Sequence, residues 1–317
     1  MVRRVLWGIA LLFMVSAVIF LIFYAFPSGD PAASRAGRLA TPEEIDRIRE
    51  TLGLDEPIYT QYWIYMKDLV LHFDFGYSYE SNAPVRELIF DRLPATISLV
   101  CGAVVLWLLA AIPVGIISAV RQRSPFDRAT MVTTLVLYSA PVFWLGLVLL
   151  YLFADDIGVF PIFPGQGAYT PISSGVGHWA SALVLPWIVL AAASAAIYAR
   201  YLRSSLIDVM GEDYIRTARA KGLGERRVIM RHGVRSAITP IVTLLGVDIG
   251  LLLAGNAILT ESVFNIPGVG RLIFTSIERS DLPVVQGVVL FGAFFIITLS
   301  IVVDIAYAYL DPRVRYA

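Results

Sequence analysis

Two acidic residues lie within long apolar segments of the sequence. Asp248 is the thirteenth residue of the 25-residue segment 236–260, and Asp304 lies near the end of the segment 282–310. A charge at the centre of a bilayer costs about 2.5–3.5 kcal/mol on insertion scales, so Asp248 is expected to face protein or water. It is interpreted either as a residue of a translocation path that meets a cationic group, or as a hydrogen-bonded carboxyl that fixes helix packing. For Asp304 we expect pairing with a basic residue at the membrane surface.

The segment around Asp248 contains further residues with two interpretations. Asn256 either lines a polar path or forms a helix–helix hydrogen bond. Gly246, Gly250 and Ala254 follow one another at intervals of four, which places small side chains on one helical face. Such a face lets a second helix approach closely, at a subunit interface or a moving contact.

Residue types that support catalysis or metal binding are sparse. The three histidines lie far apart, and the single cysteine, Cys101, excludes a disulfide framework, a structural zinc site and an iron–sulfur cluster. A phosphate-binding loop needs Gly-Lys-Ser/Thr, whereas the two lysines, Lys67 and Lys221, follow Met66 and Ala220. The sequence therefore predicts no catalytic residue, metal or cofactor in this chain.

The composition indicates a membrane protein. Of 317 residues, 57% are hydrophobic and 16% are charged, and the mean hydropathy is +0.72. A soluble domain has about 25% charged residues. A spanning helix needs about 20 apolar residues, and the sequence predicts an all-α membrane protein with six such helices, at 5–26, 94–120, 129–154, about 178–198, 236–260 and 282–310. We expect the first helix to be retained, because its 22-residue apolar stretch exceeds that of a signal peptide.

The distribution of basic residues predicts the orientation of the helices. Sixteen lie on one side of the membrane, nine of them between Arg200 and Arg235, whereas the short loops 154–177 and 261–281 have none and two. Because cytoplasmic loops are enriched in Lys and Arg, both termini are expected in the cytoplasm. Equal numbers of acidic and basic residues, 25 each, argue against a nucleic-acid partner.

Two hydrophilic regions connect the predicted helices. In the outer region, 27–93, Thr41 and Glu44 form a capping box before a short helix, and Gly53 is placed to end it. A second amphipathic segment, 59–70, is expected to lie on the membrane surface or the helix ends, or to receive an external partner. In the inner region, 200–235, a small helix over 214–220 is bounded by Gly222 and Gly224, and a basic helix over 225–235 follows. This pattern fits either a basic loop held by anionic lipid or a compact protrusion presented to another protein.

The inner helix carries a resemblance to a known family. Residues 213–223 (DYIRTARAKGL) resemble the cytoplasmic loop of permease subunits of bacterial ABC importers, in the dipeptide/oligopeptide/nickel branch. Further motifs resemble the first (B-type) permease subunit of that branch from about residue 1 to 315: 52–57 (LGLDEP), 74–77 (DFGY), 92–96 (RLPAT), 141–146 (PVFWLG), 231–232 (RH), 260–264 (TESVF), 267–271 (PGVGR), 283–287 (PVVQG) and 311–313 (DPR).

The resemblance implies that the inner helix is a coupling helix that docks onto a cytoplasmic ATPase. The residues it assigns to this contact are Asp213, Tyr214, Arg216, Thr217, Ala218, Lys221 and Gly222. Ala218 and Gly222 match the Glu-Ala-Ala-x-x-x-Gly pattern of the wider superfamily. Arg216 and Thr217 replace its Glu and first Ala, which is usual for the peptide branch and argues against a sugar substrate.

The implied function is the permease subunit of an ATP-driven importer in a bacterial or archaeal plasma membrane. The implied partners are a homologous second permease, two ATPase subunits and an extracytoplasmic binding protein. We divide the chain into residues 1–92, the first helix with the outer region, and residues 93–317, the permease core with the coupling loop 200–235. Di- or oligopeptides are the expected substrate, and nickel or another small solute is the alternative.

Two other classes of function fit less well. An intramembrane aspartyl protease needs two carboxylates at one depth, whereas Asp248 is central in its segment and Asp304 is near an end. A secondary transporter is expected to show inverted repeats, and no repeat is apparent between the two halves of the chain.

Overall fold

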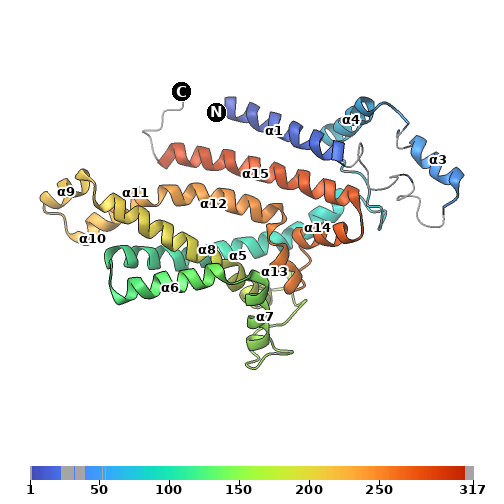
Figure 1. Ribbon diagram of the computed structural model, residues 1–317. Helices are drawn as coiled ribbons and strands as arrows, with labels where there is room; N and C mark the ends of the chain where they lie inside the picture. Colours follow the sequence, from blue (N-terminus) through green and yellow to red (C-terminus); the bar gives the residue numbers. More distant parts are fainter. Residues whose placement is uncertain (1, 23–31, 33–39, 52, 54, 311–317) are drawn as a thin grey trace.

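The structure is a computed structural model that describes residues 2–22, 32, 40–51, 53 and 55–310. Within these ranges the chain is helical and contains no strand beyond isolated bridges. The side chains of residues 2–4, 51, 303–304 and 306–310 are not described, so the expected pairing of Asp304 lies outside the described residues. Figure 1 shows the helices, whose bounds are α1 (Val2–Phe20), α3 (Pro42–Thr51), α4 (Ile58–Lys67), η2 (Asp68–His72), α5 (Val85–Val120), α6 (Pro125–Ser139), α7 (Val142–Phe153), η3 (Ile172–Ser174), α8 (Val176–Met210), α9 (Asp213–Ala220), α10 (Glu225–Arg227), η4 (Val228–Val234), α11 (Arg235–Ala237), α12 (Thr239–Leu251), η5 (Leu252–Asn256), α13 (Ile258–Val263), α14 (Val269–Glu278) and α15 (Leu282–Leu310).

The helices confirm a multi-pass, all-α architecture, although the six predicted spans are not all reproduced. Four segments in the described chain are long and apolar enough to cross a membrane: α5, α8, α12 with η5, and the 282–302 part of α15. The bent pair α6 and α7 raises this number to five. Residues 5–20 of α1 form a shorter apolar helix.

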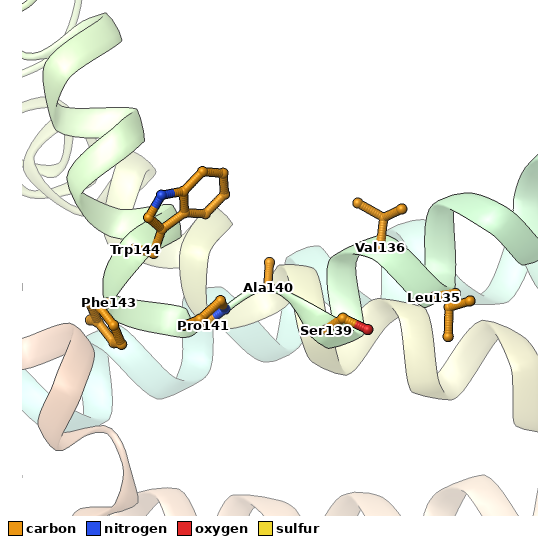
Figure 2. Close-up of a pocket in the computed structure, with 7 residues that line it drawn as sticks. All are labelled: Leu135, Val136, Ser139, Ala140, Pro141, Phe143 and Trp144. Carbon is orange, nitrogen blue, oxygen red and sulfur yellow. The ribbon is translucent and has the colours of Figure 1, made fainter.

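The third predicted span, 129–154, is wrong as a single helix. α6 and α7 meet at an angle of 101°. At the junction Ala140 is extended (φ −74°, ψ 126°) and Pro141 follows it. Proline disfavours helical geometry in the preceding residue and lacks the N–H that would continue the helix. Figure 2 shows the bend, with Val136 and Trp144 on one side of it and Phe143 on the other.

The fifth predicted span, 236–260, is also not one continuous helix. α12 and η5 run to Asn256, and the backbone breaks at Gly255, whose φ of 109° is left-handed. A Cβ on Gly270 of α14 would lie 2.7 Å from the carbonyl oxygen of Gly255. Two glycines therefore allow the break and the close approach of α14 to it.

Two other helices extend beyond their predicted ends. α5 begins at Val85 rather than Pro94, and α8 continues to Met210 rather than ending near Tyr198. Leu202 and Leu206 in the extension of α8 are fully buried. The charged residues of this stretch lie on a helix whose other face is apolar, so charge alone did not mark the helix end.

α5 and α8 form the centre of the fold. Trp107 of α5 and Tyr198 of α8 are buried with ring centroids 5.6 Å apart. A Cβ on Gly115 of α5 would lie 2.9 Å from the carbonyl oxygen of Ala199, so glycine permits the two backbones to pack closely. α12 and α15 pack beside this pair, with α1 against α15 (Figure 1).

The outer region contains the two predicted amphipathic helices. The capping box is confirmed, because the Thr41 amide donates to Glu44 Oε2 over 2.8 Å and the Glu44 amide to Thr41 Oγ1 over 3.4 Å. α4 packs on α1, where the Tyr62 hydroxyl lies 2.9 Å from Ser16 Oγ. In Figure 1 the α9–α10 segment lies at one end of the helix bundle and α3 and α4 at the other.

Candidate functional site

The inner helix α9 has one buried and one exposed face. Ile215 is fully buried and Ala218 is 6% exposed, and both pack against Val228 of η4, with Met210 and Leu223 at the edge. We refer to residues 211–227, the part of the chain that protrudes around α9, as the knob. The predicted coupling residues other than Ala218 lie on its exposed surface: Asp213, Tyr214, Arg216, Thr217, Lys221 and Gly222.

A Schellman motif ends α9. The Gly222 amide donates to the Arg219 carbonyl over 2.9 Å, and the Leu223 amide to the Ala218 carbonyl over 3.4 Å. Gly222 is left-handed, with a φ of 74°. This geometry satisfies the last carbonyl groups of the helix, and it explains why glycine follows Lys221.

An ion pair closes the turn that follows. Arg219 Nη2 lies 2.7 Å from Glu225 Oε1, and Arg219 Nε lies 3.1 Å from Glu225 Oε2. The hydrogen bonds from Arg219 lower the pKa of Glu225, and those to Glu225 raise the pKa of Arg219. The bidentate contact fixes the start of α10 relative to α9.

The knob is attached closely to α8. A Cβ on Gly233 of η4 would lie 2.9 Å from Met210 Sδ and 3.0 Å from Leu206 Cδ1. Beside the knob, a shallow cavity of about 790 Å³ is lined by Arg226, Arg227 and Arg231 with Gly224, Glu225 and Met230. The exposed surface at this end of the molecule is therefore strongly basic.

Asp248 is held by a neighbouring helix. The Tyr198 hydroxyl of α8 donates to Asp248 Oδ2 over 2.7 Å. Tyr198 is 2% exposed and Asp248 is half-buried. The contact is the hydrogen bond that the packing interpretation requires, although Asp248 is not fully buried by it.

Asn256 and the small-residue face lie on the same chain segment as Asp248. Asn256 is exposed at the end of η5, eight residues after Asp248 and beyond the backbone break at Gly255. Gly250 meets α15, because its Cβ would lie 3.2 Å from Ile296 Cα. A Cβ on Gly292 would lie 2.8 Å from that of Ala254. The predicted close approach is thus with α15 of the same chain.

Sequence reasoning missed a buried polar cluster made by Thr96, Glu261 and the start of α14. Thr96 Oγ1 donates to Glu261 Oε1 over 2.7 Å and accepts from the Val269 amide over 2.8 Å. Glu261 Oε2 accepts from the Arg271 amide over 2.8 Å. Both side chains are fully buried. The cluster joins α5, α13 and α14 and satisfies amides at the N-terminus of α14.

Three of the motifs noted in the sequence contain the residues of this cluster. A Cβ on Gly268 would lie 2.1 Å from Glu261 Oε1, so only glycine fits there. The site combines a charged residue of 260–264, a threonine of 92–96 and glycines of 267–271. Their separation of more than 160 residues between Thr96 and Glu261 concealed the contact.

A second buried contact also escaped prediction. Asp127 of α6 is 3% exposed and accepts from Arg203 Nε over 2.6 Å and from Arg203 Nη2 over 2.8 Å. The Ser118 hydroxyl donates to the same carboxylate. These bonds join the ends of α5 and α6 to α8. Among the described residues, no group of three or more His, Cys, Asp or Glu could hold a metal ion.

Comparisons with known proteins identify relatives over nearly the whole chain. Residues 111–316 match the family model described as binding-protein-dependent transport system inner membrane component, and residues 1–100 match its N-terminal counterpart. The chain is 39% identical to the dipeptide transport system permease protein DppB of Alkalihalophilus pseudofirmus, covering 99% of this chain and 98% of that protein. It is 40% identical to the glutathione transport system permease protein GsiC of Escherichia coli K12, with the same coverage of 99% and 98%.

Proposed function

The chain belongs to the family of binding-protein-dependent transport system inner membrane components, and we propose that it forms half of the translocation path of an ATP-driven importer of di- and oligopeptides. The relatives named for dipeptide and glutathione transport support a peptide substrate. The family is one of membrane transport components rather than enzymes. ATP hydrolysis is assigned to separate subunits, because neither lysine of this chain stands in a phosphate-binding loop.

The observation that carries the proposal is the two-sided construction of the knob. Ile215 and Ala218 anchor α9 on the rest of the chain, and Tyr214, Arg216 and Lys221 point outward. An exposed helix with a fixed base is suited to fit a cleft in a partner, since little conformational freedom is lost on docking. The partner we propose is a cytoplasmic ATPase. Ala218 acts through packing beneath the contact surface, and the exposed residues form the contact.

The remaining organisation follows from this assignment. The knob lies on the cytoplasmic side, and the start of α1 and the end of α15 lie toward the same end of the molecule (Figure 1). We therefore propose that both termini lie in the cytoplasm and α3 and α4 outside, in a bacterial or archaeal plasma membrane. The proposed division gives residues 1–92, with the first helix, the outer region and the first turns of α5, and residues 93–317, the permease core.

The proposed complex contains four kinds of partner. A homologous second permease completes the path, two ATPases bind the two coupling helices, an extracytoplasmic binding protein delivers substrate, and the bilayer surrounds the helices. Asp248 is the proposed polar group of the path, held in orientation by Tyr198. Asn256, exposed on the same chain segment, is the second. A cationic group such as a peptide ammonium is the ligand that the Asp248 carboxylate would attract.

Other substrates and other classes of protein are distinguished by specific features of the chain. Nickel or another small solute would use the same architecture, and uptake assays with peptide and metal distinguish them. An aspartyl protease would need a second carboxylate beside Asp248, whereas the side chain that contacts the Asp248 carboxylate is the Tyr198 hydroxyl. A secondary transporter does not bind an ATPase, so the proposed ATPase contact of the knob argues against this class.

Copurification from the native membrane tests the proposal. The tagged chain, gently solubilised, is expected to bring down a second permease and two ATPase subunits, identified by mass spectrometry. Arg216→Glu should lower the recovered ATPase at least tenfold. Arg121→Glu, the same charge change at an exposed residue after α5, should leave recovery within twofold. Isolation of the chain alone, or equal loss in both variants, would reject the coupling assignment.

A further inference from the structure

A cavity of about 560 Å³ lies between α1, η2, α5 and α15, away from the knob and from Asp248. Its walls are side chains of α1 (Ile9 and Leu12), the α4–η2 segment (Met66 and Leu69) and α15 (Phe291 and Phe294). We propose that this cavity binds one acyl chain of a membrane phospholipid. The inference does not depend on the proposed transport function.

The lining excludes polar occupants. Ser16 is the one polar side chain in the lining. Its hydroxyl already donates to the Phe13 carbonyl over 2.8 Å and lies 2.9 Å from Tyr62 Oη. The volume would hold on the order of twenty water molecules at about 30 Å³ each, but each buried water needs two to four polar partners. A peptide carries a donor and an acceptor at almost every residue and meets the same obstacle.

The size of the cavity excludes a helix of another subunit. A helix about 10 Å across that rises 1.5 Å per residue fills the volume with only about five residues. A hydrocarbon chain is flexible and fits a space between packed helices. An empty cavity would forfeit the dispersion contacts of its lining, so filling by hydrocarbon is favoured.

The rim of the cavity opens toward lipid. Val70 is 64% exposed, Phe73 is 52% exposed, and Phe90 and Phe294 are each 46% exposed. α5 and α15 are apolar helices predicted to span the bilayer, so the exposed side chains of Phe90 and Phe294 face hydrocarbon. Lipid acyl chains are therefore the apolar molecules that reach the cavity.

The α4–η2 segment sets the depth of the entrance and the place of the headgroup. Met66, Leu69, Val70 and Phe73 line the cavity, whereas three of the four intervening positions are polar: Lys67, Asp68 and His72. This arrangement is typical of a segment that lies in the membrane interface. His72 pairs with Asp68 over 3.4 Å, and Lys67 is exposed. An ammonium group beside an apolar entrance complements a phospholipid phosphate at the interface.

A photoreactive phospholipid with a diazirine in its acyl chain tests the proposal. The complete protein, with any subunits that accompany it, is reconstituted with this lipid, extracted with detergent to remove loosely associated lipid, and then irradiated. Adducts should map to peptides that contain Leu12, Met66 and Phe294, at least fivefold above adducts at Leu109, an exposed α5 residue outside the cavity. No excess at the cavity after extraction would overturn the proposal.

Two adjacent leucines provide matched variants. Leu12→Trp fills the cavity and should lower the adduct yield at Met66 and Phe294 at least fivefold, and Leu11→Trp, at an exposed neighbour, should change it less than twofold. Equal yields in both would overturn the proposal. If Leu12→Trp does not assemble, Leu69→Phe adds a smaller ring to the same cavity. Lys67→Glu should lower labelling by an anionic photolipid, and labelling by a photoreactive free fatty acid alone would reject the phospholipid as ligand.

Discussion

Replacing Thr96 with valine should destabilise the protein more than any change of similar size in its transmembrane helices. Valine has nearly the same shape, so packing is kept and the hydroxyl is lost. The Val269 amide then loses its acceptor, and Glu261 loses a donor. An unsatisfied buried group costs about 1–3 kcal/mol, and a hydrogen bond to a charged group contributes about 1.5–3 kcal/mol. Because the two losses share one cluster and are not additive, we expect a loss of about 3–5 kcal/mol.

The apparent melting temperature of the solubilised complex measures this loss. A change of 1 kcal/mol shifts the melting temperature of a domain of 150–250 residues by about 2–4 °C, so Thr96→Val should lower it by at least about 6 °C. Thr134→Val is the matched control. Thr134 is 9% exposed, but its hydroxyl donates to the Met131 carbonyl in its own helix over 3.0 Å. That carbonyl keeps its place in the helix, so the control should melt within about 1 °C of the unmodified protein.

A serine at position 96 separates the hydroxyl from the methyl group. Thr96→Ser keeps both hydrogen bonds and should recover most of the stability lost in Thr96→Val. The reasoning is refuted if Thr96→Val melts at the temperature of the unmodified protein. It is also refuted if Thr96→Val and Thr134→Val fall by the same amount, or if Thr96→Ser falls as far as Thr96→Val.

Four further predictions concern the knob and the Asp248 contact. Gly222→Ala places an L-residue at a φ of 74° with no atom within 4 Å of its Cβ, so it should cost about 1 kcal/mol of backbone strain and speed hydrogen exchange of the Leu223 amide about fivefold; Gly224→Ala, at a φ of −59°, should not. Because Arg219 lowers the pKa of Glu225, the ion pair stabilises the turn fully above the ordinary Glu225 pKa of 4.5, and this stabilisation is lost as the pH falls through the lower pKa of the folded protein. Hydrogen exchange at residues 221–225, corrected for its intrinsic pH dependence, should therefore rise as the pH is lowered below 4.5. Glu225→Gln should lose this rise. Tyr198→Phe removes the donor to Asp248 and should lower the free energy of unfolding by about 1.5–3 kcal/mol, measured by thermal unfolding. Asp248→Asn should lower the uptake of cationic peptides more than that of neutral peptides. Unchanged uptake of both would reject Asp248 as a path residue.

Local sequence rules predicted the features whose contacts are close in the chain. The capping box of Thr41 and Glu44, the helix over 214–220 and its termination at Gly222 each depend on residues within a few positions of one another. The family resemblance extended the predictions from these local features to the whole chain. The break at Pro141 was available to the same rules, but hydropathy dominated the interpretation because segment 129–154 is free of charge. A proline between two apolar runs of 12 to 15 residues indicates a break between two helices as strongly as the hydropathy indicates one span.

Local sequence rules could not predict contacts between residues that are distant in the chain. Nothing near Glu261 in the chain indicates that Thr96 supplies its donor, and Asp248 has its partner 50 residues away in Tyr198. The small-residue face was predicted correctly as a close contact, but its partner could be any helix. The structure assigns it to α15, because Gly250 meets Ile296 and Ala254 meets Gly292. Periodicity identifies which face is apolar or small, and the neighbour is decided only by the complete packing.

The difference between the predicted and the observed end of α8 shows how one long-range contact changes the functional interpretation. Charge suggested that the span ends near Tyr198, yet Arg203 is compensated by Asp127 of α6, so the helix continues without an isolated buried charge. The 35 residues of α8 are about 50 Å long. One continuous helix consequently carries Tyr198, which holds Asp248, and Leu206 and Met210, which support the knob through Gly233. A partner that displaces the knob would therefore act on the same helix that orients Asp248.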